Sequence, residues 1–71
     1  MKTAQLEVFV VGDNEPFKFN GEDAKNMHYS IQKSFADGSG LAISELKNGY
    51  TTTFILSNIS AIHYSGGDAH D

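Results

Sequence analysis

Histidine and aspartate residues near the end of the chain have the side chains most able to hold a metal ion. His63, Asp68, His70 and Asp71 lie close together and offer nitrogen and oxygen atoms that suit zinc. Their spacing does not form a closed four-ligand pattern, and three of them lie in a glycine-rich segment. His28 flanks the apolar stripe of a predicted helix and is interpreted as a boundary residue. We therefore expect no metal site and no cofactor, and the absence of cysteine excludes thiolate sites and disulfides.

Serine, histidine and aspartate also invite comparison with a hydrolytic triad. The sequence has no strained nucleophile turn, and a domain of this size has little room for a pocket that shifts the pKa of a general base. Gly38-Ser39-Gly40 is glycine-rich like a phosphate loop, but it follows a predicted helix, whereas phosphate loops precede one. No lysine comes directly after it. These features predict a binding protein that is not an enzyme.

The charge balance bears on which partners the chain can take. Its 71 residues include nine acidic residues, five lysines and no arginine, for a net charge of −4. Arginine is the residue best suited to gripping phosphate, and phosphate neutralisation drives most nucleic-acid affinity. Nucleic-acid binding is therefore disfavoured. The first apolar stretch is too short and too alternating for a signal peptide, and no run could span a membrane, so we expect a cytoplasmic protein without membrane contact.

The run Thr51-Thr52-Thr53 places hydroxyl groups on both faces of one predicted strand. Such a run is typical of a strand with one solvated face. It would also make a flat, polar and adaptable recognition surface. The sequence leaves both interpretations open.

Alternating apolar residues and one helical stripe predict the elements that position these side chains. Strands are expected over residues 5–11, 17–19, 41–46, 50–56 and 60–64, with one helix between the second and third. The fold class is then α+β: a four- or five-stranded, mainly antiparallel sheet with one helix packed on one face, in the order β-β-α-β-β. Residues 1–64 form a single domain, and residues 65–71 are expected to be a flexible polar tail.

Start and stop signals mark the predicted helix. Asn20 can cap its N-terminus, with Asp23 reaching back toward the cap. Gly38 is suited to a left-handed terminator. The apolar stripe between these signals consists of Ala24, Met27, Ile31 and Phe35.

Asn48-Gly49 predicts a tight hairpin between the third and fourth strands. A type I′ turn needs positive φ at both central positions, and this pair is a strong signal for one.

Residues 7–64 resemble short proteins of unknown function from Gram-positive bacteria and their phages. The shared pattern is a hairpin, a helix ending in glycines, and then a closing hairpin carried here by Leu41, Ile43, Gly49, Ile59, Ile62 and Tyr64. The resemblance implies a β-β-α-β-β fold and an origin in a phage or other mobile element. It implies no site residue.

The first strand predicts a surface for self-association. Leu6, Val8 and Val10 share the face that would receive the helix, which leaves Phe9 and Val11 on the opposite face. The candidate interface consists of Phe9, Val11, Tyr50, Thr52 and Tyr64. We therefore expect a homo-oligomeric, protein-binding regulator or inhibitor. The alternative is a protein that sequesters a small ligand at a site between subunits.

Overall fold

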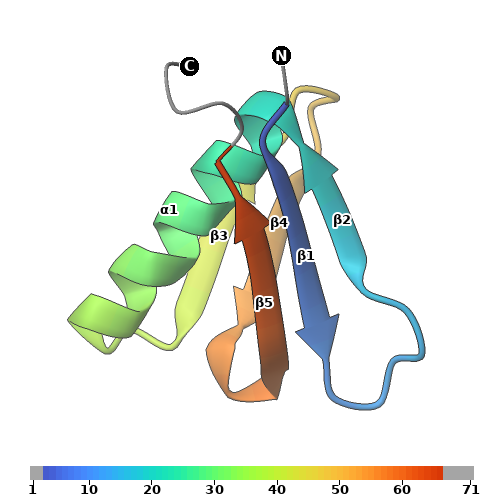
Figure 1. Ribbon diagram of the computed structural model, residues 1–71. Coiled ribbons are helices and arrows are strands. Elements are labelled where there is room, and N and C mark those ends of the chain that lie inside the picture. The colour runs from blue at the N-terminus through green and yellow to red at the C-terminus, as the bar shows by residue number, and fades with distance from the viewer. Residues whose placement is uncertain (1–2, 67–71) are drawn as a thin grey trace.

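The computed structural model describes residues 3–66 and contains five strands, one α-helix and one 3₁₀ turn. Their bounds are β1 Gln5–Val10, β2 Phe17–Asn20, α1 Gly21–Asp37, β3 Leu41–Glu45, β4 Thr51–Ile55, η1 Leu56–Asn58 and β5 Ile59–Ser65 (Figure 1). The α+β class and the β-β-α-β-β order are confirmed, and the expected fifth strand follows as β5. No helix within residues 3–66 is long and apolar enough to cross a membrane.

The strands form two antiparallel sheets, in place of the single sheet expected from the sequence. One sheet has the order β2-β1-β5 and the other consists of β3 and β4. The 3₁₀ turn η1 explains this division, since it redirects the chain after β4. The backbone N–H of Val11 donates to the carbonyl of Asn58 at 2.8 Å, which holds the end of η1 against the end of β1. Strand β5 therefore pairs with β1 and leaves β4 with a single neighbour.

Strand β5 is longer than predicted and includes Ser65, which lies opposite Gln5 of β1. Ser65 was predicted to be the first residue of a flexible tail, but it belongs to β5 because the pairing with β1 continues past Tyr64. The rest of that segment, residues 67–71, lies outside the described residues.

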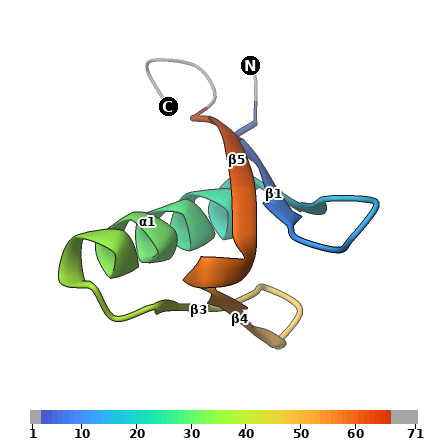
Figure 2. The ribbon, with the colours of Figure 1, turned by 90° about the horizontal axis from the view of Figure 1, so that it is seen from below.

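The core lies between α1 and the inner faces of both sheets. Helix α1 packs against β3 and also contacts β1 and β2, while Figure 2 shows β3 and β4 beneath the helix. Strand β1 presents Leu6 and Val8 inward, as its alternation predicts. The buried apolar residues are Ala4, Leu6, Val8, Ala24, Met27, Ile31, Ala42, Phe54 and Leu56. One continuous core thus joins the two sheets through the helix.

The N-terminal end of α1 differs from the predicted capping arrangement. Asn20 occupies the cap position, but its side chain makes no capping hydrogen bond. The residue still belongs to β2 and pairs with Gln5, so its side chain projects from the outer face of the sheet. Asp23 does not reach back to Asn20, because its Oδ1 accepts a hydrogen bond from the backbone N–H of Lys47 at 3.1 Å. This bond ties the β3–β4 hairpin to the first turn of the helix.

The C-terminal end of α1 follows the predicted terminator but not the predicted stripe. Gly38 has φ 70° and its N–H donates to the carbonyl of Ser34 at 2.9 Å. Ala24, Met27 and Ile31 are buried, whereas Phe35 is 53% exposed and Ser34 is buried in its place. The Ser34 hydroxyl donates to the carbonyl of Leu41, which turns this side of the helix toward β3. Phe35 lies about 100° further around the helix. Its side chain is therefore at the edge of the buried face of the helix and partly exposed.

The β3–β4 hairpin has a three-residue loop, so the predicted type I′ turn is wrong. Gly49 has φ 92°, but no residue other than glycine has positive φ among the described residues. The N–H of Gly49 donates to Leu46 at 2.9 Å, and the N–H of Leu46 donates to Tyr50 at 2.7 Å. Asn48 accepts from the N–H of Tyr50 at 3.0 Å through its Oδ1. A loop of this length needs positive φ only at its last residue, which is the glycine.

Candidate functional site

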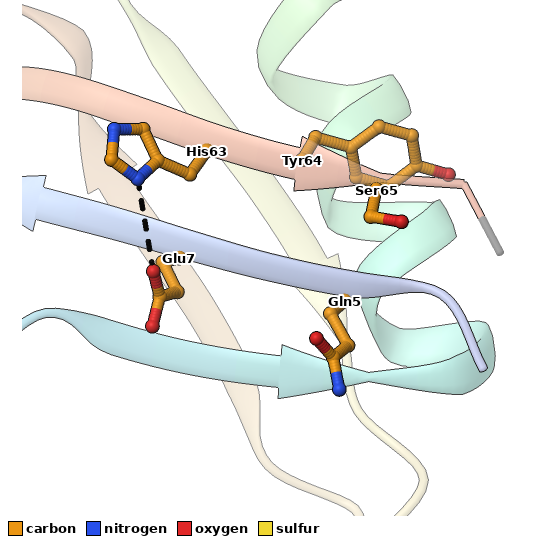
Figure 3. A pocket seen from close by; sticks show the side chains of 5 residues that line it. All are labelled: Gln5, Glu7, His63, Tyr64 and Ser65. Carbon is orange, nitrogen blue, oxygen red and sulfur yellow. Dashed lines mark ion pairs between the residues drawn. The ribbon is translucent and has the colours of Figure 1, made fainter. Parts of the chain in front are cut away.

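The outer face of the three-stranded sheet carries a shallow pocket of about 240 Å³. It is formed where β1 and β5 run side by side, and its lining residues are Gln5, Glu7, His63, Tyr64 and Ser65 (Figure 3). In Figure 3 the side chains of Glu7 and His63 point toward one another from these two strands. The pocket is polar and open to solvent.

Glu7 lies between Lys18 and His63 on this face. Its carboxylate lies 3.9 Å from the Lys18 ammonium and 3.8 Å from His63 Nδ1. The Phe9 ring meets the His63 ring edge-on, with centroids 5.2 Å apart. Exposed pairs of this kind contribute little to stability, since water screens them. Within residues 3–66, no three histidine, aspartate or glutamate side chains come together at a metal-binding distance.

His28 and Tyr64 form an aromatic stack on the other side of the same sheet. Their ring centroids are 3.8 Å apart and the rings are 7° from parallel. Tyr64 lies opposite Leu6 of β1 and therefore shares the inward face of β5. Burial lowers the pKa of the His28 imidazole from its ordinary value of 6.5. The stack thus holds His28 between α1 and β5, where burial favours the neutral form of the imidazole.

We expect the free energy of unfolding to fall as the pH is lowered below about 6.5, and His28 to contribute to that fall. The pKa of His28 is lower in the folded protein, so the unfolded chain binds more protons in this range. The stabilising effect of neutral His28 is complete above about pH 6.5 and is lost as the pH falls through the folded-state pKa. Urea midpoints of the parent and of His28→Gln, measured at about pH 8 and about pH 5, should show a smaller pH difference in the variant. Equal differences would contradict this role.

The outer face of the β3–β4 hairpin is an exposed apolar surface. Leu41, Ile43 and Ile55 are 47%, 55% and 52% exposed, and Leu41 lies directly opposite Ile55. The inward positions of β3 are the small residues Ala42 and Ser44, which are buried. Strand β3 thus directs its small side chains into the core and its large apolar side chains to the surface. We call Leu41, Ile43 and Ile55 the outer patch.

A groove of about 220 Å³ separates β4 from the β1–β2 hairpin. Its lining residues come from both sheets and from η1: Val10, Phe17, Thr52, Thr53, Phe54, Ile55 and Asn58. The Phe17 and Phe54 rings, which both line the groove, meet edge-on with centroids 5.4 Å apart. Every lining residue is uncharged, so the groove suits an apolar group.

The five residues of the candidate interface do not form one surface. Phe9 lies on the outer face of the three-stranded sheet, and Val11 is exposed just beyond the end of β1. Tyr50 is exposed beside the β3–β4 loop, while Tyr64 is engaged with His28. Thr52 faces inward opposite Ser44 and lines the groove. Sequence reasoning missed the outer patch, although the large-small alternation of β3 is a visible signal for it.

Comparisons of the chain with protein-family models, with curated proteins and with solved structures found no match. The resemblance to short phage and Gram-positive proteins therefore stays a prediction.

Proposed function

We propose that this protein is a non-catalytic, protein-binding module of the cytoplasm that acts as a homo-oligomer, a regulator or inhibitor from a phage or other mobile element. The outer patch is the observation that carries the proposal. It consists of three half-exposed aliphatic side chains on adjacent strands of one small sheet. Contiguous exposed apolar surface is a feature of protein-contact sites.

The packing of β3 adds an energetic argument for self-association. Fully covering a leucine or isoleucine side chain contributes about 1.5–3 kcal/mol, and the three residues of the outer patch are each about half exposed. Covering them would add roughly 2–4 kcal/mol. A short chain has a small core and gains stability from a partner by mass action. A second copy of the chain is always present at the same concentration, which favours it as the first partner.

The other surfaces favour binding over catalysis. The side chains around Glu7 are exposed to solvent, and the contacts of Glu7 with Lys18 and His63 are long. His28, whose pKa is lowered, is held in a stack with Tyr64 and does not line either the polar pocket or the groove. A general acid or base needs both a shifted pKa and access to a substrate.

Light scattering on the purified protein tests the self-association. We expect the parent to be an oligomer at tens of micromolar and Ile43→Glu to be a folded monomer, because a buried, unpaired carboxylate at the contact is costly. Phe9→Glu is the matched control, placing the same charge on the outer face of the other sheet. It should leave the oligomer intact. A monomeric parent would contradict the proposal, and dissociation by Phe9→Glu alone would move the contact away from the outer patch.

A further inference from the structure

Strand β4 has one free edge. It pairs with β3 on one side only, and within the described part of the chain no backbone group outside β3 is hydrogen-bonded to residues 51–55. Natural edge strands are commonly protected by a lysine, a proline or a bulge. The sequence of β4, Thr-Thr-Thr-Phe-Ile, has none of these. Its pairing with β3 also runs without a register shift.

The pairing pattern shows which backbone groups face that edge. Leu46 is hydrogen-bonded to Tyr50 at one end of the hairpin, and Leu56 donates to Gly40 at the other. Antiparallel pairs alternate between bonded and non-bonded. Tyr50 and Leu56 are the bonded positions at the two ends of β4, so every second residue between them is also bonded to β3. Thr52 and Phe54 therefore direct their N–H and C=O groups to β3. The N–H and C=O groups of Thr51, Thr53 and Ile55 therefore point to the open edge.

The apolar groove lies along this same edge. Thr52, Thr53, Phe54 and Ile55 are consecutive in β4 and all line it. A strand laid on the edge would make hydrogen bonds to Thr51, Thr53 and Ile55, and one of its side chains would enter the groove beside Phe17. Backbone pairing combined with a neighbouring side-chain pocket is how several domains recognise extended peptides.

We propose that β4 binds an extended segment of another protein as an added strand, with an uncharged apolar side chain in the groove. The inference deepens the protein-binding part of the proposed function and does not depend on self-association. Charge complementarity defines the occupant further. The groove has no charged lining residue, while the chain carries a net charge of −4, so an apolar segment with basic flanks fits best.

The probe is the seven-residue peptide Lys-Val-Thr-Ile-Thr-Val-Lys, acetylated and amidated, titrated into nitrogen-15-labelled protein. Two further peptides keep the side chains but carry N-methyl groups, one on its three aliphatic residues and one on its two threonines. We expect the parent peptide to bind with a dissociation constant below about 1 mM and to slow hydrogen exchange at the amides of Thr51, Thr53 and Ile55. At least one methylated peptide should bind about tenfold more weakly, equivalent to about 1.4 kcal/mol.

Protein variants supply the matched comparison. Thr53→Pro removes one N–H donor from the open edge, a position where proline is tolerated. It should weaken binding of the parent peptide about tenfold. Thr53→Val keeps the N–H donor and should bind the peptide as the unsubstituted protein does. If Thr53→Pro does not fold, the methylated peptides decide. Titrating the peptide into Ile43→Glu separates this inference from self-association, and we expect unchanged binding there.

Three results would overturn the proposal. The first is the absence of binding at about 1 mM peptide. The second is undiminished binding of both methylated peptides, which would mean that the groove takes a side chain without strand pairing. The third is protection of the same three amides that grows with protein concentration in the absence of peptide, which would assign the edge to a second copy of the chain.

Discussion

Replacing Ile31 with alanine is expected to lower the free energy of unfolding by about 2–5 kcal/mol. Ile31 is fully buried on α1, in the row that continues Ala24 and Met27 toward β3. Removing its side chain beyond Cβ would leave a cavity between the helix and the sheets, which are packed too tightly to close it. Small domains are stable by only about 5–15 kcal/mol, so this single change removes a large part of the total.

Phe35→Ala is the matched control for this prediction. Phe35 lies one turn further along the same helix but is 53% exposed, so its truncation should cost less than Ile31→Ala despite removing more atoms. Urea denaturation followed by circular dichroism, with the midpoint compared at constant slope, measures both variants. An equal or larger loss for Phe35→Ala would mean that the helix presents a different face to the core than the one described.

Replacing Gly49 with valine is expected to cost about 1–3 kcal/mol. Gly49 has φ 92°, a backbone conformation that β-branched residues rarely adopt. No atom lies within 4 Å of the position that its Cβ would occupy, so the cost is conformational and not a steric clash with a neighbour. The strain would fall on the three-residue loop that connects β3 to β4.

Gly49→Asn separates this explanation from a general intolerance of side chains in the loop. Asparagine adopts positive φ more readily than valine and occupies a similar volume, so it should cost clearly less. Thermal unfolding of the three proteins gives the comparison. Equal losses for valine and asparagine, or no loss for valine, would show that the backbone at Gly49 changes conformation when the residue is substituted.

The elements of this fold could be predicted from the sequence because each depends on local pattern. Leu6 and Val8 alternate toward the core, and Gly38 ends the helix as its type predicts. The division into two sheets could not be predicted, since it depends on η1 and on the pairing of β1 with a strand at the other end of the chain. The burial of Ser34 in the position expected for Phe35 could not be predicted either. It depends on a tertiary contact, the hydrogen bond from the Ser34 hydroxyl to a carbonyl of β3.

The candidate surfaces were harder to predict than the elements. The faces of β1 were predicted correctly for Leu6, Val8 and Phe9, whereas Val11 lies beyond the end of the strand. Which residues of other strands lie beside Phe9 depends on strand order. Tyr64 proved to be on the inner face and Thr52 beside the groove. The outer patch could have been inferred once β3 was taken as a strand, because Leu41 and Ile43 alternate with smaller residues. The free edge of β4 could not be predicted from the sequence, because it depends on β5 pairing with β1 and not with β4.

The pairing of β1 with β5 also sets the order in which the chain can fold. The two hairpins, β1–β2 and β3–β4, close short loops and can form early, whereas the Gln5–Ser65 pair closes nearly the whole described chain. During synthesis β1 leaves the ribosome before β5 and cannot complete its pairing until β5 has emerged. Until then its open edge and the inner side chains Leu6 and Val8 are accessible to other chains. We therefore expect aggregation of the newly made chain to depend on how soon β5 pairs with β1.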